Sequence, residues 1–302
     1  MAEPLALDAI RRPNAMDLGL MLMLSIIWAS AFLAIKVVVP ETGPLWLATM
    51  RVVIAFLVLL PLAMYKGMVW PEDAHQWRMI FIIMSLNVVI PFFLISWAEQ
   101  YIDAGIASLL MGVGPFMALV GSHFTTHDDR LTGTKVIGAI CGFSGVLVLV
   151  GWDAVQGLGD NLLGQLATIL ASACYVSSSL MMRRLKAFPP VRLLALVLGM
   201  AALTLLTLSL LWAGLPAQNY SAGSWLGMVY LGVFPSALGY ILRYHLIRTV
   251  GVSAFSGSIN LIPVFGVLLS ALLLGEALSL NVFLSLGLIV SGLFIIRQGQ
   301  KG

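Results

Sequence analysis

Residues 108–120 read SLLMGVGPFMALV, and residues 256–268 read SGSINLIPVFGVL. Both stretches are apolar, begin with a small residue and carry a proline near the middle. A proline inside a helix removes one backbone hydrogen bond and clashes with the carbonyl group four residues before it. The two prolines therefore predict kinks with free carbonyl groups at Met111 and Ile259. Within a membrane, such backbone is tolerated only where protein or a water-filled cavity satisfies it.

The composition of the whole chain predicts a membrane protein. Hydrophobic residues make up 60% of the 302 residues and charged residues 10%, and the mean hydropathy is +1.02. Soluble domains are about 45–50% apolar and about 25% charged, so this chain lacks the polar surface of a soluble fold. The basic residues are spread along the chain, which argues against nucleic acid as a partner. Both cysteines lie in apolar stretches, so no disulfide framework is expected.

Long apolar stretches predict the membrane spans. A helix needs about 20 apolar residues to cross the hydrocarbon core. By this measure the chain contains ten spans, at 17–39, 45–65, 77–98, 102–124, 133–151, 162–182, 190–214, 223–246, 253–274 and 280–297. The sequence therefore predicts an all-α integral membrane protein with ten transmembrane helices and no room for a soluble domain.

The positions of lysine and arginine predict the orientation of the spans. Basic residues lie in the tails and in alternate connections, at Arg11, Arg12, Lys66, Arg78, Arg130, Lys135, Arg183, Arg184, Lys186, Arg192, Arg248, Arg297 and Lys301. The intervening connections, around Glu41, Asp103, Asp153, Asn219 and Glu276, contain none. Basic connections stay in the cytoplasm, so both termini are predicted to be cytoplasmic, in a bacterial-type inner membrane.

The start of the chain has a second interpretation. Two arginines, an apolar stretch from Leu18 and the sequence Ala29-Ser30-Ala31 resemble a cleavable signal peptide. The apolar stretch continues to Val39, however, which is longer than the apolar region of such a peptide. Removing it would also leave nine spans and break the alternation of basic and non-basic connections, so we expect 17–39 to be a membrane span.

An internal repeat relates the two halves of the chain. A shift of 148 residues superimposes three pairs: Trp77 with Trp225, Pro115 with Pro263, and Asp128 with Glu276. The predicted plan is a tail at 1–16, a five-helix repeat at 17–151, an outer connection at 152–161, a second repeat at 162–298 and a tail at 299–302. Because five is odd, the second repeat must enter the membrane inverted. Inverted repeats are typical of secondary transporters.

Three segments carry a resemblance to a known family: WASAFLAIK (28–36), LATMRVVIA (47–55) and AEQYIDAGIASLLMGVGP (98–115). Together with the five-plus-five inverted plan, they resemble the drug/metabolite transporter superfamily. Within it the chain is similar to EamA-type permeases and, among these, to YddG-type amino-acid exporters. The resemblance implies a proton- or gradient-dependent carrier whose central cavity is built mainly from the first, third, fourth, sixth, eighth and ninth spans.

Polar and aromatic residues in these spans are candidate site residues, because polar groups within a membrane are costly. The substrate-binding candidates are Trp28, Lys36, Asn87, Trp97, Met111, Tyr175, Tyr240, Tyr244 and Asn260. The gating or coupling candidates are Arg51, Glu99, Pro115, His245 and Pro263. Lys36 and Arg51 are alternative partners for a substrate carboxylate, although each could instead extend to the membrane interface. The aromatic residues would line the cavity or simply pack helices.

The acidic residues limit the kind of transport. The first span has no acid between Leu18 and Val39, whereas the related small multidrug exporters use a first-span glutamate for cations and protons. This difference argues against a cationic-drug antiporter. Coupling to protons would have to use Glu99, His245 or another group.

Other motifs predict structure rather than chemistry. His123 and His127 precede two aspartates in a pattern that can bind metal, but a predicted helix end favours an interfacial turn. No metal, cofactor or catalytic site is therefore expected. The small-residue pairs Gly138-x-x-x-Gly142 and Gly287-x-x-x-Ser291 favour close helix packing within one chain, hence a monomer, with a homodimer as the alternative.

These features predict a secondary transporter that exports small zwitterionic metabolites by alternating access through a central cavity. Amino acids with apolar or aromatic side chains are the expected substrates. Alternatives are a carrier of another small metabolite, such as a nucleotide sugar, or of a drug. An intramembrane lipid-modifying enzyme and a passive channel are alternatives from other classes.

Overall fold

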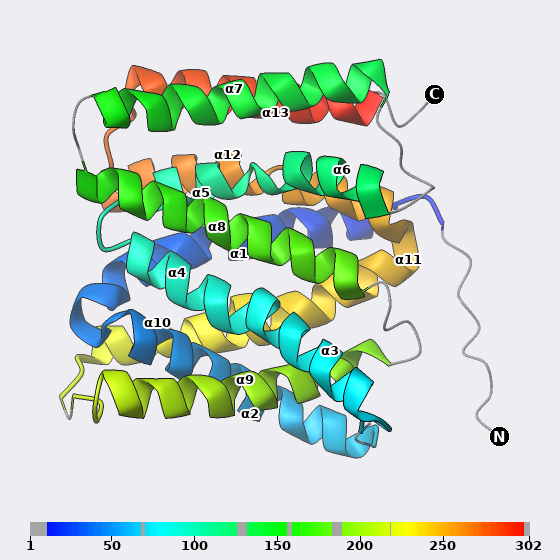
Figure 1. Cartoon of the computed structure of the whole chain (residues 1–302), viewed down its shortest axis with the longest axis vertical. Helices are drawn as coiled ribbons and strands as arrows, with labels where there is room; N and C mark the ends of the chain where they lie inside the picture. Colours follow the sequence, from blue (N-terminus) through cyan, green and yellow to red (C-terminus); the bar gives the residue numbers. More distant parts are fainter. Residues whose placement is uncertain are drawn as a thin grey trace.

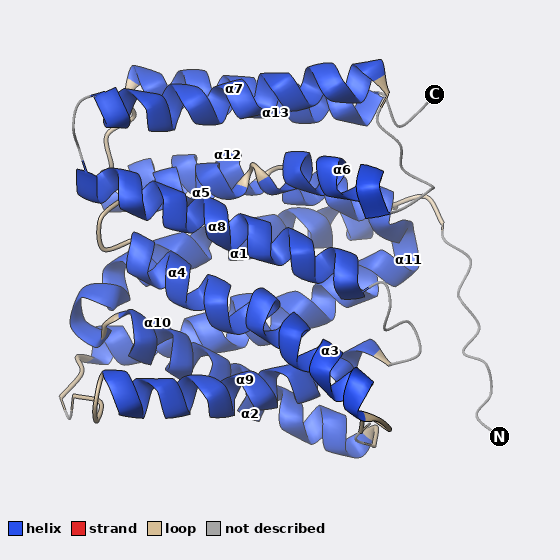
Figure 2. Cartoon of the chain, in the orientation of Figure 1, coloured by secondary structure: helices blue, strands red, loops and turns tan. Residues whose placement is uncertain are grey.

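The computed structural model describes residues 11–67, 70–125, 132–155, 159–182, 189–217 and 219–298, without the side chains at 122–125, 151–155, 159–160, 190, 252–254, 256–257 and 297. All regular structure in these ranges is helical (Figure 2). The α-helices are α1 Ala15–Thr42, α2 Pro44–Tyr65, α3 Ala74–Met84, α4 Ile90–Ala98, α5 Ala104–Met111, α6 Gly114–Thr125, α7 Gly133–Val155, α8 Gly159–Met182, α9 Pro190–Trp212, α10 Ala222–Leu231, α11 Gly239–Ile259, α12 Ile262–Leu269 and α13 Leu280–Gln298. Three π-helical segments join some of them: η1 Ser85–Val89, η3 Gly232–Leu238 and η4 Ser270–Leu274.

The prediction of an all-helical membrane protein is confirmed. Eight helical segments in the described ranges are long and apolar enough to cross a membrane, and they correspond to the first eight predicted spans. The ninth and tenth correspond to shorter apolar helices, Ile262–Leu274 and Leu280–Ile296. The start of α1 and the end of α13 lie on the same side of the bundle (Figure 1).

Local sequence determines where the first two helices meet. Asn14 and Asp17 form a capping box at the start of α1, in which each side chain accepts a hydrogen bond from the other residue's backbone N–H. At the other end, α1 is separated from α2 by Gly43 alone, whose φ of 71° is readily adopted only by glycine. Pro44 then begins α2, a position where its missing N–H costs no helical hydrogen bond.

Corresponding elements of the two halves begin 148 residues apart. Helices α3 and α10 start at Ala74 and Ala222, and the preceding residues, Asp73 and Ser221, both cap their helix by accepting a backbone N–H bond three residues on. The π-helical segment η1 falls, after the same shift, within η3. Single-turn π segments inside α-helices frequently mark functional sites.

The two proline stretches form broken spans rather than kinked helices. One span is interrupted between α5 and α6, and the other between α12 and the part of α11 that follows its turn at Gly251 (φ 84°), again 148 residues apart. Pro115 and Pro263 are each the second residue of the new helix, α6 or α12. The expectation of a proline within a continuous helix was therefore wrong, because each proline occupies a first turn, where its missing N–H is tolerated.

The broken spans cross each other in antiparallel directions. Three close pairs mark the crossing of the two broken spans: Gly105 with Ser270, Ser108 with Gly266, and Gly112 with Pro263. A Cβ atom added to Gly112 would lie 2.8 Å from Cγ of Pro263. The absence of side chains at these glycines is what allows the two helices to approach.

Helices α7 and α13 pack side by side along one face of the bundle (Figure 1). Gly138 and Gly142 of α7 contact Gly292 of α13 so closely that a Cβ on Gly292 would lie 2.5 Å from the Gly138 carbonyl oxygen. Gly287, by contrast, faces open space, and Ser291 is exposed. Packing within the chain thus uses Gly292, and the expectation for Gly287 and Ser291 was wrong because they lie on another face of α13.

Candidate substrate site

Arg51 is a buried arginine within the membrane-spanning helix α2. Only 8% of the surface of Arg51 is exposed. The Nε atom donates a hydrogen bond of 2.8 Å to Oγ of Ser236, in η3, and Ser236 in turn donates to the Leu231 carbonyl. The guanidinium carbon lies 3.8 Å from the ring centroid of Phe92, in α4. These contacts fix the plane of the guanidinium, so that its other two nitrogens point in a defined direction.

Arg51 has no anionic partner among the described residues. No carboxylate there lies within 4.0 Å of its guanidinium, and Nη1 and Nη2 make no hydrogen bond with a described residue. Tyr175 and Tyr240 are close enough to interact with it electrostatically. A buried charge normally requires a paired counter-charge. The free edge of the guanidinium presents the planar pair of donors that binds a carboxylate in two parallel hydrogen bonds.

Trp28 forms an aromatic wall with Tyr240 and Phe255. The Trp28 ring lies 6.5 Å from the Tyr240 ring and 6.3 Å from the Phe255 ring, in edge-to-face arrangements. Its Nε1 atom donates a 3.0 Å hydrogen bond to the Pro235 carbonyl of η3. Gly239 permits this approach, since an added Cβ would lie 2.7 Å from that nitrogen.

The same π-helical segment thus orients two candidate side chains. Pro235 accepts from Trp28, and its neighbour Ser236 accepts from Arg51. Asn87, in η1, donates to the Tyr240 hydroxyl over 3.5 Å. The structure therefore brings together four sequence candidates from both halves of the chain: Trp28, Arg51, Asn87 and Tyr240.

Lys36 makes a different set of contacts from Arg51. Its ammonium donates hydrogen bonds to the backbone carbonyls of Glu99 (3.0 Å) and Ile102 (2.7 Å), just beyond the end of α4. A carboxylate oxygen of Asp103 lies 3.9 Å away. A cation at a helix C-terminus is favourable because the last carbonyl groups lack helical partners. Lys36 therefore has a structural role in this conformation, and its three donors are largely occupied.

Glu99 is buried without a hydrogen-bond partner. It follows the span Ala74–Ala98 directly, the residue is 1% exposed, and neither side-chain oxygen has a partner. Burial raises the pKa of the Glu99 carboxyl well above its ordinary value, and Glu276 adds to this, whereas Lys36 and Arg51 oppose it. Such an orphaned group requires an explanation, since buried polar atoms are nearly always satisfied.

Glu276 joins the two halves at the same end of the molecule. Its carboxylate accepts hydrogen bonds from the backbone N–H groups of Ala104 (2.8 Å) and Gly105 (2.9 Å), at the start of α5. A carboxylate at a helix N-terminus is favoured by the helix dipole. Asp103, Ser270 and Glu276 also border a small pocket between α5 and α12.

The remaining candidates have their described contacts elsewhere. The Trp97 ring packs 4.9 Å from the ring of Tyr101, and the Arg248 guanidinium lies 5.8 Å from the Tyr244 ring. Met111 and Asn260 are partly buried at the two helix breaks. No sequence pattern singles out Phe92, Ser236 or Phe255, because an apolar ring and a serine are common in any membrane helix.

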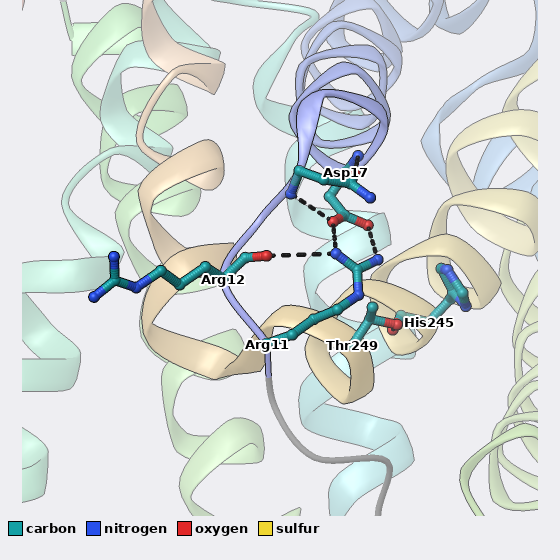
Figure 3. A network of polar contacts seen from close by, with 6 residues as sticks. Arg11, Arg12, Asp17, His245 and Thr249 are labelled. Atoms are coloured by element: carbon teal, nitrogen blue, oxygen red, sulfur yellow. Dashed lines mark hydrogen bonds and ion pairs between the residues drawn. The ribbon is translucent and has the colours of Figure 1, made fainter.

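His245 lies near the start of α1, in the network of Figure 3. Arg11 bonds both carboxylate oxygens of Asp17, at 2.5 and 3.0 Å, and its backbone N–H donates to the Thr249 carbonyl. His245 is exposed and interacts electrostatically with Asp17. This network ties the segment before α1 to α11.

The histidines considered for metal binding, His123 and His127, lie where side chains are not described. Within the part of the chain that is described, no group of three or more metal-binding side chains occurs.

The architecture defines a multi-span membrane protein with crossed, broken spans and a buried polar site between its halves. The chain belongs to the EamA-like transporter family, whose model matches residues 16–151 and again residues 162–298. It is therefore a membrane transporter, and a small-molecule substrate and the lipid bilayer are its partners.

Several transporters are similar to this chain along most of its length. The uncharacterized transporter YoaV of Bacillus subtilis (strain 168) is 23% identical, covering 90% of this chain and 93% of its own. The uncharacterized inner membrane transporter YedA of Escherichia coli (strain K12) is 26% identical, covering 93% and 90%. A protein of Streptantibioticus cattleyicolor named a probable terminal-alkyne amino-acid exporter is 25% identical, covering 91% of each chain.

The fold also matches a solved crystal structure. The two share a TM-score of 0.66 and 19% identity, over 95% of this chain and 98% of the other. At this identity the match concerns the fold alone.

Proposed function

We propose that this protein is a secondary transporter that exports small zwitterionic metabolites, with amino acids bearing apolar or aromatic side chains as substrates. The observation that carries this proposal is the buried guanidinium of Arg51, which has free donors and no anionic partner among the described residues. A substrate carboxylate supplies the missing negative charge. The amino-acid exporter among the similar proteins is consistent with a substrate of this class.

The neighbourhood of Arg51 favours a substrate with one apolar side chain. Trp28, Tyr240 and Phe255 offer aromatic surface beside the polar site, and such rings contact apolar groups favourably. A nucleotide sugar carries several negative charges, and the other nearby cation, Lys36, is engaged with backbone carbonyls. A monocarboxylate zwitterion therefore fits the site better than a polyanion.

Alternating access is supported by the crossing of the two broken spans. Discontinuous helices at corresponding positions of inverted repeats commonly form the transport site in secondary transporters. Here Pro115 and Pro263 lie in the first turn of the second segment of each broken span, and the two spans touch at Gly112. We infer that the segments on either side of each break tilt relative to one another when access changes from one side to the other.

Ten spans, with both termini in the cytoplasm of a bacterial-type inner membrane, complete the proposed topology. The alternation of basic and non-basic connections supports it. A test uses single cysteines in a variant whose Cys141 and Cys174 are alanine. An impermeant maleimide should label Ala217→Cys in intact cells and Thr132→Cys only after permeabilisation, both positions being exposed. The reverse pattern would show the opposite orientation.

We further propose that the carrier works as a monomer and that protons are its coupling ion. Glu99 is the group best suited to take up a proton, because it is buried and unpartnered.

An intramembrane enzyme is the alternative from another class, but the similar proteins are named as transporters.

The test of the proposed function is amino-acid uptake into proteoliposomes by Arg51 variants. Removing one charged hydrogen-bonding partner costs about 1.5–3 kcal/mol, or roughly 10- to 150-fold in affinity. Arg51→Gln should therefore raise KM for amino acids by about that factor, and Arg51→Lys should recover only part of it, since lysine lacks the planar fork. Arg78→Gln, at an exposed arginine, is the matched control. Unchanged KM in Arg51→Gln would refute the role of Arg51.

A further inference from the structure

We propose that the carboxylate of Glu99 binds the ammonium group of the substrate, so that Glu99 and Arg51 together recognise an α-amino-acid zwitterion by its two opposite charges. This inference rests on the proposed function and adds a second substrate contact to it. It also explains why a carboxylic acid is kept in an environment that offers its side-chain oxygens no hydrogen bond.

The first support is that two buried ionisable side chains of opposite type, Arg51 and Glu99, do not pair with each other. Arg51 is 8% and Glu99 1% exposed, yet their side chains are not within the 4.0 Å of an ion pair. The Arg51 guanidinium lies 3.8 Å from the Phe92 ring, and Glu99 follows Phe92 by seven residues, about two turns along the same face of α4. In a membrane protein, intramembrane charges normally pair or mark a substrate pathway. Here the Arg51 guanidinium and the Glu99 carboxyl lie beyond the distance of a direct ion pair.

The second support is that Lys36, the nearest alternative partner of Glu99, is directed elsewhere. Its ammonium donates to the Glu99 and Ile102 backbone carbonyls and approaches Asp103. It makes no hydrogen bond with the Glu99 carboxylate, whose oxygens are both unpartnered. The arrangement holds the backbone of the α4–α5 connection in place and leaves the Glu99 side chain available for a ligand.

The third support is the size of an amino acid. Its ammonium nitrogen and carboxylate oxygens lie about 3 Å apart, as standard bond lengths require. One charge-assisted hydrogen bond of about 2.8 Å at each end lets it bridge two groups that are too distant for a direct ion pair. The Glu99 oxygens are sealed from solvent in this conformation, so ammonium binding belongs to a conformation in which this end of the molecule is open.

The experiment compares amino acids with analogues that lack the amino group. The full-length protein in proteoliposomes is loaded with L-phenylalanine or L-leucine, and counterflow of the labelled amino acid is inhibited from outside. The inhibitors are the same amino acids and their des-amino counterparts, 3-phenylpropionate and 4-methylpentanoate. The wild type should prefer each amino acid over its analogue by roughly 10- to 150-fold, the contribution of one charged hydrogen bond to affinity.

The Glu99→Gln variant should lose this preference selectively. Inhibition by the amino acid should weaken until it resembles that of the analogue, whereas inhibition by the analogue should not change. Glu99→Asp should retain part of the preference, and Glu72→Gln, at an exposed glutamate, should retain all of it. Arg51→Gln should weaken amino acid and analogue alike, because both carry the carboxylate.

The outcomes separate this inference from the proposed function. One outcome is that the wild type carries phenylalanine or leucine and yet is inhibited equally by each amino acid and its des-amino analogue. That result would overturn the ammonium site and leave the transport assignment intact. The same conclusion follows if Glu99→Gln weakens amino acid and analogue by equal factors, or weakens neither. A wild type that carries no amino acid would overturn both. The wild-type comparison needs no variant, so it holds even where Glu99→Gln fails to fold.

Discussion

Gly112 and Pro263 touch at the point where the two broken spans cross, and a Cβ on Gly112 would lie 2.8 Å from Cγ of Pro263. The two residues come from opposite halves of the chain, and each lies at or beside the break in its span. We therefore expect a movement at one break to displace the other. This contact is where a carrier of this fold would couple its two halves.

Gly112→Ala should disturb this crossing. The added methyl group would meet the rigid proline ring and also the Leu109 carbonyl at 2.9 Å, and overpacking of this kind costs about 1–3 kcal/mol. We expect a lower melting temperature of the detergent-solubilised protein and slower transport. Gly287→Ala is the matched control, since a methyl group there meets nothing within 4 Å and alanine favours a helix. Equal melting temperatures for the two variants would contradict the close contact.

Pro115→Ala and Pro263→Ala test whether the breaks act as hinges. Each alanine restores an N–H group that can bond the carbonyl four residues earlier, at Met111 or Ile259, and so favours one continuous helix. Transport should slow several-fold in each single variant and further in the double variant. The melting temperature should not fall, because alanine is a good helix former. A double variant that transports at the wild-type rate would show that the breaks are only structural.

Lys36→Met should affect stability more than substrate affinity. The change removes two hydrogen bonds from a charged donor to the Glu99 and Ile102 carbonyls. A hydrogen bond to a charged group contributes about 1.5–3 kcal/mol, so the melting temperature should fall. The KM for amino acids should change less than in Arg51→Gln. A larger KM effect in Lys36→Met would indicate that lysine, and not Arg51, holds the substrate carboxylate.

Glu99→Gln should change how stability depends on pH. Because burial raises the pKa of Glu99 in the folded protein, the wild type is most stable where this carboxyl is protonated. Its stability should decline as pH rises from the ordinary glutamate range, about 4.3, through the raised pKa, since the folded state must then ionise a buried group. Glutamine does not titrate, so the variant should lack this decline and exceed the wild type at alkaline pH. If the melting temperatures of the wild type and the variant depend on pH in the same way, the pKa of Glu99 is not raised in the folded protein.

The sequence alone could predict the helices and the positions of the breaks, because hydropathy and proline report directly on local structure. Trp77 and Trp225, or Pro115 and Pro263, reveal a shift of 148 residues that recurs in the starts of α3 and α10. The breaks themselves were mistaken for kinks, since a sequence does not show whether a proline lies within a helix or at its start.

The candidate site could be predicted only in part, because tertiary contacts decide which polar groups are free. Lys36 and Arg51 are equivalent candidates in sequence, but only the structure shows lysine bound to backbone carbonyls and Arg51 without an anionic partner among the described residues. Ser236 orients Arg51 from a span 185 residues away, which no local pattern could indicate.

A counterflow experiment shows whether this transporter carries amino acids, as we propose. Proteoliposomes loaded with unlabelled phenylalanine, leucine or another apolar amino acid should accumulate the labelled form transiently, with saturation at high concentration. Empty liposomes and Arg51→Gln proteoliposomes should accumulate far less. If folded and correctly inserted protein accumulates none of the amino acids in a panel of labelled substrates, amino acids are not its substrates.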